Sequence, residues 1–385
     1  MSDIASTLTA AVDSGLAGVV AAVTKNGETI FDGAAGVRTL GESVPMTVDT
    51  VVAIYSMTKA ITGAAAMQLV ERGQLSLDEP AGRYLAELAD AQVLTGFDPD
   101  GAPLLRPAAN PVTLRHLLTH TSGFVYDMWN ADLARYGEVA GLPPLTSLQK
   151  QALRVPLAFE PGTRWDYGTG LDWAGLMVEE VTGQTLGQFC AENLFGPLGM
   201  SDTGFAPTDT MAQRAASIHL RTPDGIVPFA LPAPEAPEFE MGGGGLLSTV
   251  SDYLKFANMI LGGGSLSTTR VLNEATVVEM SRNNIGDIDV APLVTVNPML
   301  TCDADFWPGM QQKWGLSFLI NTEVSPQGRP AGSLAWAGLA NSYYWIDPVN
   351  NVCGVWATQL FPFFDPAAIG AFRAFESATY ASLAG

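Results

Sequence analysis

Positive charge is scarce in this chain of 385 residues. Nineteen Lys and Arg stand against 39 Asp and Glu, which gives a formal net charge of −20 at pH 7. Nucleic-acid binding depends on clustered Lys and Arg, and a strongly negative protein is repelled by anionic membrane surfaces. We therefore expect neither a nucleic acid nor a membrane as a partner.

Long apolar runs and cysteines are also lacking. No stretch approaches the length needed to span a bilayer, and the N-terminus lacks the basic and apolar regions of a signal peptide. The only three cysteines, Cys190, Cys302 and Cys353, are widely spaced, and none forms a Cys-x-x-Cys pair. This pattern predicts reduced thiols in a cytoplasmic protein.

Several familiar catalytic patterns are missing. There is no Gly-x-Ser-x-Gly motif. Of the three histidines, His116 and His120 have a zinc-like i, i+4 spacing, but Leu117 stands where a metalloprotease helix needs Glu. We expect these two in core or capping roles and His219 in solvent. The run Gly242–Gly245 lacks the Lys-Ser/Thr of a phosphate loop and indicates tight packing or a hinge. No metal or organic cofactor is implied.

What the chain does have is apolar content. Hydrophobic residues make up 47% and charged residues 15%, which is enough for a large buried core. The length fits two domains, or one large domain with an insertion.

The two ends of the chain contain the strand signals. Residues 17–37 predict a hairpin with Asn26-Gly27 as its turn. Helices are predicted at 56–72, 249–261 and 366–383. Gly73 follows the end of the first. Thr249 or Ser251 is expected to cap the second, and Gly262 follows it. Further strands are predicted at 314–322, 333–339, 342–347 and 352–360.

The middle of the chain differs in character. From about residue 75 to 240, short helical pieces alternate with Pro- and Gly-rich loops. We therefore predict an α/β (α+β) fold in which both termini complete one sheet. Its first part is 1–74, a mostly helical insertion domain is 75–241, and the second part is 242–385.

Ser56-Met57-Thr58-Lys59 is the strongest candidate for chemistry. Residues at i and i+3 share one helical face, and an amine that is desolvated by apolar surroundings can act as the base for a serine hydroxyl. Apolar residues flank both Ser56 and Lys59. The alternative is a helix cap with an ordinary surface lysine. Ser147-Leu148-Gln149-Lys150 has the same spacing in polar surroundings, and there we expect only an exposed helix cap.

Five further segments occur in a recognisable order: TLRHLLTHTSGF (113–124), FEPGTRWDYGTG (159–170), GPLGMSDTGF (196–205), GGGGLLSTVSDYLKFANMIL (242–261) and WAGLANSYYWIDP (336–348). With SMTK they resemble the serine β-lactamase and penicillin-binding-protein superfamily. The similarity is greatest to the family VIII carboxylesterases, which resemble class C β-lactamases.

The resemblance implies a β-lactamase/transpeptidase-like fold, with an antiparallel sheet flanked by helices, an all-helical domain, and a site between them. It implies Ser56 as nucleophile, Lys59 as its amine partner and Tyr167 as proton carrier, with either Lys59 or Tyr167 as the formal base. The N–H groups of Ser56 and Leu339 would form the oxyanion hole. Trp336 and Gly338 would belong to the substrate-binding third motif.

Two departures from the lactamase pattern bear on the substrate. Trp336 replaces the lysine that attracts a substrate carboxylate, and Thr169 replaces the asparagine that recognises an amide. Both favour a small neutral ester, and hence a carboxylesterase. An amidase, D-amino-acid peptidase, weak β-lactamase or transacylase using the same acyl-serine is the alternative. A non-catalytic module is a third possibility.

Loops at 94–111, 125–147 and 221–241 and the segment 283–312 are expected to shape the acyl and alcohol pockets. Their aromatic residues are candidate walls, although ordinary packing explains each equally well. They are Phe97, Tyr126, Trp129, Phe229, Phe306 and Trp307.

Overall fold

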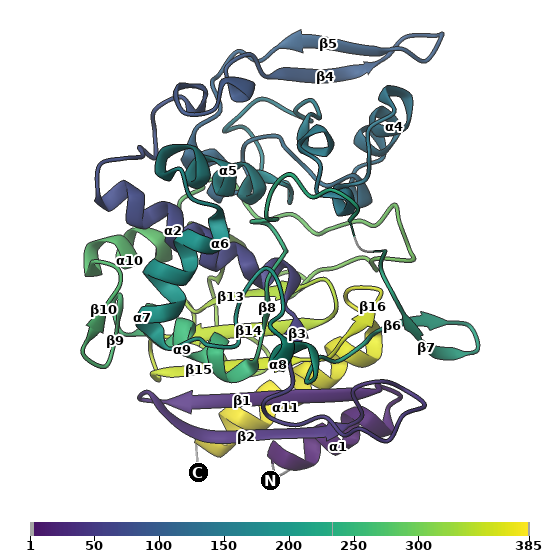
Figure 1. The fold of residues 1–385 in the computed structure, drawn as a ribbon, viewed down its shortest axis with the longest axis vertical. Coiled ribbons are helices and arrows are strands. Elements are labelled where there is room, and N and C mark those ends of the chain that lie inside the picture. Colours follow the sequence, from purple (N-terminus) through teal and green to yellow (C-terminus); the bar gives the residue numbers. More distant parts are fainter. Residues whose placement is uncertain (1–3, 233, 384–385) are drawn as a thin grey trace.

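A seven-stranded antiparallel sheet joins the two ends of the chain in the computed structural model, which describes residues 4–232 and 234–383. The strand order is β11-β12-β13-β14-β15-β1-β2, so that N-terminal β1 pairs with C-terminal β15 (Figure 1). The strands are β1 (Gly18–Lys25), β2 (Glu28–Gly36), β11 (Gln312–Trp314), β12 (Leu319–Asn321), β13 (Leu334–Gly338), β14 (Ser342–Asp347) and β15 (Val352–Ala357).

The turn between β1 and β2 is the predicted one. Asn26 and Gly27 lie between the strands with φ of 54° and 80°. Both values are in the left-handed region that a two-residue turn of this kind requires, and Asn and Gly reach that region most easily. The local sequence therefore sets the register of this hairpin.

Helices cover both faces of the sheet. Helices α1 (Ile4–Asp13) and α11 (Pro366–Leu383) pack on one face, and α9 (Val250–Leu261) packs on the other. Successive residues of β14 show the alternation: the Tyr343 ring lies 4.4 Å from that of Phe372 in α11, and Tyr344 lies 4.9 Å from Tyr253 in α9. Helices α9 and α11 were predicted, whereas α1 was not.

Helix α2 (Thr58–Glu71) runs through the centre of the molecule. Every residue from Thr58 to Leu69 is buried, so the helix has no solvent face. The 3-10 turn η1 (Tyr55–Met57) leads into it, and Gly73, with φ of 69°, follows its end as predicted.

The segment 75–241 is not all-helical, which corrects the expectation that the resemblance implied. It contains the hairpins β4 (Gln92–Phe97)–β5 (Pro103–Pro107) and β6 (Ile218–Thr222)–β7 (Gly225–Phe229). Its helices are α3 (Leu114–Leu118), α4 (Ala131–Ala140), α5 (Gly170–Thr182), α6 (Leu186–Cys190), α7 (Gly196–Leu198) and α8 (Asp209–Ala212), with a π-helical turn η7 (Ala191–Phe195). Its 3-10 turns are η2 (Ala81–Arg83), η3 (Ala86–Leu88), η4 (Asp127–Trp129), η5 (Leu145–Ser147) and η6 (Lys150–Leu153).

Strand β6 also pairs in parallel with β16 (Leu360–Phe361), which ties the end of this segment to the C-terminal part. The remaining elements are the short pairs β3 (Val52–Ala53)–β8 (Leu247–Ser248) and β9 (Ser265–Leu266)–β10 (Thr269–Arg270), and helix α10 (Glu274–Ser281).

Two further expectations were wrong. The single strand at 314–322 is a hairpin, β11–β12, whose connection contains Ser317 with φ of 77°. His219 is not in solvent: it is 2% exposed on β6, and its Nε2 accepts the Leu40 N–H at 3.0 Å. The parallel pairing with β16 covers this histidine, and the local sequence around it contains no sign of that pairing.

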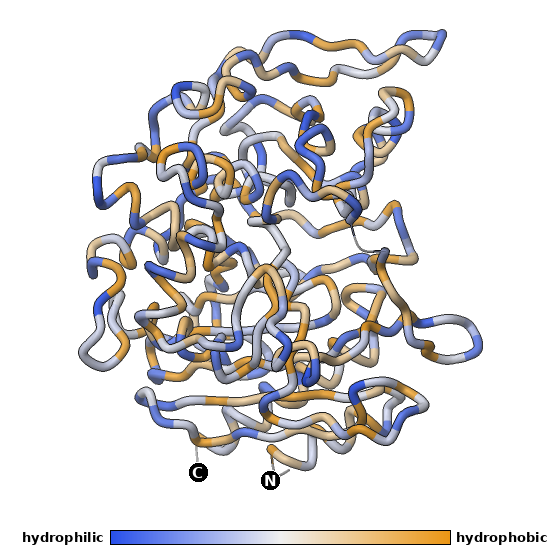
Figure 2. Tube along the Cα trace, in the orientation of Figure 1, coloured by the Kyte–Doolittle hydropathy of each residue, from blue (hydrophilic) through white to orange (hydrophobic). Residues whose placement is uncertain are grey.

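Figure 2 shows hydrophilic residues concentrated at the tips of the β4–β5 and β6–β7 hairpins, whereas hydrophobic residues are frequent in the sheet. Among the described residues, none of the helices combines the length and the hydropathy that a membrane span requires.

A buried ion pair joins α11 to the loop after β12, and we expect it to be important for stability. Arg329 donates to Glu376 at 2.7 Å, and both side chains are at most 2% exposed. Glu376→Gln leaves the guanidinium without its counter-charge, so we expect a loss of about 3–5 kcal/mol of unfolding free energy in urea denaturation.

The matched control is Glu79→Gln, which removes a carboxylate from the exposed pair with Arg83 and should cost less than about 1 kcal/mol. The double variant Arg329→Met/Glu376→Leu should recover most of the loss. Equal destabilisation by the two single Gln variants would contradict this assignment.

Candidate active site

Ser56 lies in the 3-10 turn η1, where the sheet and the central helix meet. Tyr55, immediately before it, has φ of 44°, and the Met57 N–H donates to Ile54 O at 3.1 Å to close the turn. The hydroxyl of Tyr253 in α9 donates to Met57 O at 2.9 Å. The turn is therefore held by its own backbone hydrogen bond and by a side chain of α9, while Ser56 itself stays partly exposed.

Lys59, one turn later, is fully buried. Its Nζ donates to three oxygens: Ser56 Oγ at 3.2 Å, the Tyr126 hydroxyl at 2.9 Å and Gly243 O at 2.6 Å. A carbonyl oxygen can only accept, so the Gly243 contact always uses an N–H of the amine. The remaining positions on the nitrogen are directed to the serine and the phenol.

Burial lowers the pKa of Lys59 from its ordinary value, and the nearby charge of Asp172 opposes that shift. The carboxyl of Asp172 is itself fully buried, and burial raises its pKa. An amine in this environment loses its proton much more readily than a surface lysine, as a base for the Ser56 hydroxyl must.

Tyr167 is buried beside the same serine. Its hydroxyl accepts the Trp336 Nε1–H at 2.9 Å. Burial raises the pKa of Tyr167, and hydrogen bonding to Ser56 and Trp336 acts in the opposite direction. The Lys59 Nζ lies 4.8 Å from the centre of the Tyr167 ring. The structure thus brings Ser56, Lys59 and Tyr167 together.

His120 supports the Tyr167 loop rather than the serine. Its ring lies 4.6 Å from that of Tyr167, and its Nδ1 accepts the Gly168 N–H at 3.3 Å. Burial holds the pKa of His120 well below its usual value. A neutral imidazole packed in the core agrees with the role expected from the sequence.

Strand β13 passes directly against η1. A Cβ on Gly338 would lie 2.3 Å from Ile54 O and 2.3 Å from Ser342 Oγ, so only glycine fits there. The structure therefore gives Gly338 a packing reason, whereas the substrate contact that the resemblance implied stays a prediction. Leu339 follows the strand and is partly exposed.

Trp336 and Thr169 are more enclosed than expected. Trp336 is 4% exposed, and its ring packs at 4.7 Å from Trp314 and 5.5 Å from Phe306. The Thr169 hydroxyl is buried and has no hydrogen-bond partner among the described residues. Trp336 thus holds Tyr167 in place, and it fills the position of the third motif with an uncharged ring.

From the sequence, Tyr126 was predicted only as a candidate pocket wall, whereas in the structure its hydroxyl accepts a hydrogen bond from Lys59. Trp129 and Phe306 do lie in the same aromatic group, at 5.5 Å from Tyr167 and Trp336 respectively. Phe97 instead packs under Arg135, and Phe229 packs against Phe361.

Asp172 was missed entirely. The signal available was a carboxylate inside the apolar run GLDWAGLMV, five residues after Tyr167.

The second Ser-x-x-Lys pair is arranged differently. Ser147 ends η5 and Lys150 begins η6, so the two do not share a helix, and the expected helix cap was wrong in that respect. Ser147 Oγ accepts the Gln149 N–H at 3.3 Å, in the turn between them.

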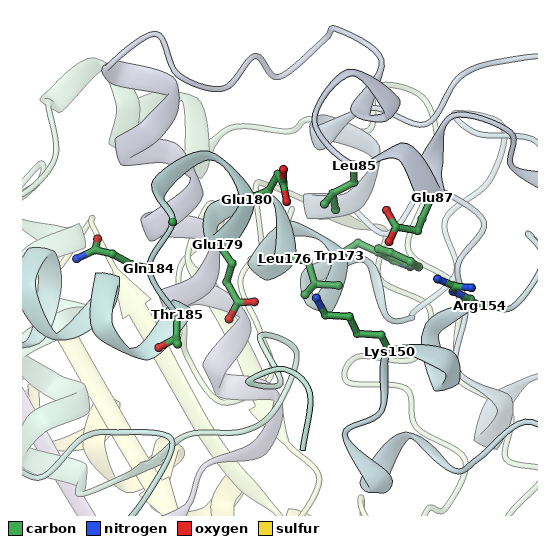
Figure 3. A pocket seen from close by; sticks show the side chains of 11 residues that line it. Leu85, Glu87, Lys150, Arg154, Trp173, Leu176, Glu179, Glu180, Gln184 and Thr185 are labelled. Atoms are coloured by element: carbon green, nitrogen blue, oxygen red, sulfur yellow. The ribbon is translucent and has the colours of Figure 1, made fainter. Parts of the chain in front are cut away.

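Lys150 borders a hollow of about 410 Å³ on the outer side of α5, where Trp173, Glu179 and Glu180 also project (Figure 3). Neither Ser56 nor Lys59 lines it. The two faces of α5 are therefore distinct: Asp172 accepts the Gly243 N–H on the inner face, whereas Trp173, Glu179 and Glu180 border this outer hollow.

Comparisons with known proteins agree with this geometry. The Beta-lactamase family model matches residues 4–378. The chain is 35% identical to a lovastatin esterase of Penicillium rubens, over 92% of this chain and 91% of the relative. It is 31% identical to an ML-236A carboxylate methylbutanoyltransferase of Penicillium citrinum, over 95% and 90%.

Among solved structures, the LovD6 mutant of simvastatin synthase from Aspergillus terreus superposes with a TM-score of 0.84 at 30% identity. The match covers 99% of this chain and 96% of that one. The fold and the resemblance deduced from the sequence motifs are thereby confirmed. The chain belongs to the beta-lactamase family, and within it to the serine hydrolases and acyltransferases.

Proposed function

We propose that the protein is a carboxylesterase that acts on neutral carboxylic esters through an acyl group carried on Ser56. The observation that carries the proposal is the fully buried Lys59 amine 3.2 Å from Ser56 Oγ. A serine hydroxyl needs such a neighbouring base to become a nucleophile near neutral pH. Ser56 itself is partly exposed, as a residue that meets a substrate must be.

Each step then has a group to perform it. The Lys59 amine and the Tyr167 phenol, acting as a unit, take the Ser56 proton as Oγ attacks the ester carbonyl carbon. The Ser56 and Leu339 N–H groups stabilise the resulting oxyanion. The carbon–oxygen bond to the alcohol breaks, and the alcohol leaves with the proton. Water then attacks the acyl-serine by the same route, which releases the carboxylic acid and restores the hydroxyl.

The preference for a neutral substrate is argued from Trp336. In the lactamase pattern a lysine at this position attracts a substrate carboxylate. Here an indole takes the place of that lysine and donates its N–H to Tyr167, so the positive charge of the lysine is missing from this position. The three cysteines are free thiols, which supports the cytoplasm as the compartment we propose.

Acyl transfer is the second candidate, because one relative at 31% identity is named a methylbutanoyltransferase and the relative at 35% an esterase. The two reactions share the acyl-serine and differ only in whether water or an alcohol accepts the acyl group.

Ser56→Ala should abolish acylation. We expect hydrolysis of p-nitrophenyl butyrate to fall by at least about 10³-fold, and intact mass should show no fluorophosphonate adduct. Ser147→Ala is the matched control, since it alters the other Ser-x-x-Lys pair and should keep full activity. A Ser56→Ala variant that hydrolyses the ester like the wild type would refute the proposal.

Adding an alcohol should reveal the preferred acceptor. With p-nitrophenyl butyrate as donor and increasing 1-butanol, we expect butyric acid to remain the main product, because an esterase admits water to the acyl-serine. Chromatography of acid and butyl ester gives the ratio directly. If the new ester predominates and p-nitrophenol release accelerates with alcohol, the enzyme is a transferase.

A further inference from the structure

Asp172 is a fully buried carboxylate that the reaction described above does not use. It lies in the first turn of α5, and neither of its oxygens reaches solvent. Oδ1 accepts the Gly243 N–H at 2.8 Å, whereas Oδ2 has no hydrogen-bond partner among the described residues. Burying a carboxylate with so few partners is costly unless an opposite charge lies close by.

Gly243 connects this carboxylate to the Lys59 amine. Its N–H donates to Asp172, and its carbonyl accepts from Lys59 Nζ at 2.6 Å. One turn later on α2, the Thr62 hydroxyl donates to Gly242 O at 2.7 Å. The glycine run is thus held between α2 on one side and α5 on the other.

The close approach of Asp172 and Tyr126 to the backbone explains why residue 243 is a glycine. A Cβ at position 243 would lie 2.6 Å from Asp172 Oδ2 and 3.0 Å from the Tyr126 hydroxyl. At position 242 it would lie 2.6 Å from Leu171 O. Gly242–Gly245, which the sequence left as tight packing or a hinge, therefore lets a carboxylate and a phenol reach the peptide that holds Lys59.

The other titratable groups that face this pair are uncharged near neutral pH. Burial raises the pKa values of Tyr126 and Tyr167 and lowers that of His120. Asp127 also acts on Tyr126, from a solvent-exposed position. Of the described residues that enclose this space, Lys59 and Asp172 are thus the two able to hold opposite charges.

We propose that Asp172 is a positioning residue for Lys59: its carboxylate fixes Gly243, whose carbonyl holds the amine against Ser56, and its negative charge is the counter-charge of that amine. The inference rests on the proposed acylation of Ser56 and adds a residue that sets the pH above which the Lys59 amine can accept the serine proton. Among the described residues, Asp172 makes no hydrogen bond to Ser56, and its side chain is fully buried, so its effect on the serine position runs through Gly243 and Lys59.

The arrangement has a directional consequence for the amine. With one N–H committed to Gly243 O, a neutral Lys59 can give a second N–H to Tyr126 and direct its lone pair at the Ser56 hydroxyl. If Gly243 were free to shift, the same nitrogen could turn away from the serine. A misplacement of about 1 Å at such a point can cost on the order of 10²-fold in rate.

Asp172→Asn tests the charge while preserving the shape. A negative charge favours the ammonium form, so its removal lets Lys59 lose its proton at lower pH. We therefore expect the acidic limb of the pH profile of kcat/KM to move to lower pH by about 1 unit or more. The same direction holds if Tyr167 is the formal base, because the charge of Asp172 also disfavours its phenolate. The matched control, Glu180→Gln, removes an exposed carboxylate from the outer face of α5 (Figure 3) and should leave the limb unshifted.

Asp172→Ala tests the positioning, since it also removes the acceptor of the Gly243 N–H. We expect kcat at the pH optimum to fall by on the order of 10²-fold with little change in KM, because Asp172 does not touch the substrate. The proposal is overturned if both Asp172 variants, folded by circular dichroism, match Glu180→Gln in the position of the limb and in kcat.

A measurement on the wild type covers the case in which the variants do not fold. The chain has only five lysines, so the Nζ resonance of Lys59 can be assigned in ¹⁵N-lysine-labelled protein by its loss in Lys59→Met. We expect it to titrate below the other four and to show a second inflection as Asp172 gains its proton. A single inflection at an ordinary lysine pH overturns the proposal. This titration does not depend on activity, so an inactive or Ser56-independent enzyme would refute only the proposed function.

Discussion

The burial of one lysine amine is the constraint on which this active site depends. An ammonium group without water is tolerated only where oxygens surround it and an opposite charge lies near. Lys59 has Ser56, Tyr126 and Gly243 as oxygen partners, and Asp172 supplies the charge. The same burial that makes the amine costly to enclose also lowers its pKa, as the proposed role of Lys59 as a base requires.

The groups around that amine come from both parts of the fold. The turn η1 supplies Ser56, and strand β13 of the sheet packs against that turn. The segment 75–241 supplies Tyr126, Tyr167 and Asp172, the last of these on α5, which packs against α2. The reaction geometry therefore depends on how this segment packs on the sheet, and a change in that packing would separate the base from its phenols even with every side chain present.

Local patterns predicted most of the regular structure, and long-range contacts explain what they did not. The Asn26-Gly27 turn and the helix 366–383 follow from residues close in sequence. The burial of His219 depends on β16, some 140 residues away, and so could not be seen. The site divides likewise: Ser56 and Lys59 are neighbours on one turn, whereas Asp172 acts through Gly243, whose partners are separated from it by 71 and 184 residues. The family resemblance located Tyr167, but its motifs gave no reason to single out Tyr126 or Asp172.

Hydrolysis and acyl transfer use the same enclosed groups up to the acyl-serine, so these groups are not what would separate an esterase from a transferase. The choice is made afterwards, by whichever nucleophile reaches the acyl carbon while the base is free. That access depends on the surroundings of Ser56, and loops around a site are generally less constrained by packing than the core. Trp129 and Phe306 each pack on an enclosed aromatic ring, Tyr167 or Trp336 respectively, while remaining partly exposed. Substitutions at such positions could change the acceptor without disturbing the buried amine, which is how one catalytic core can serve both reactions.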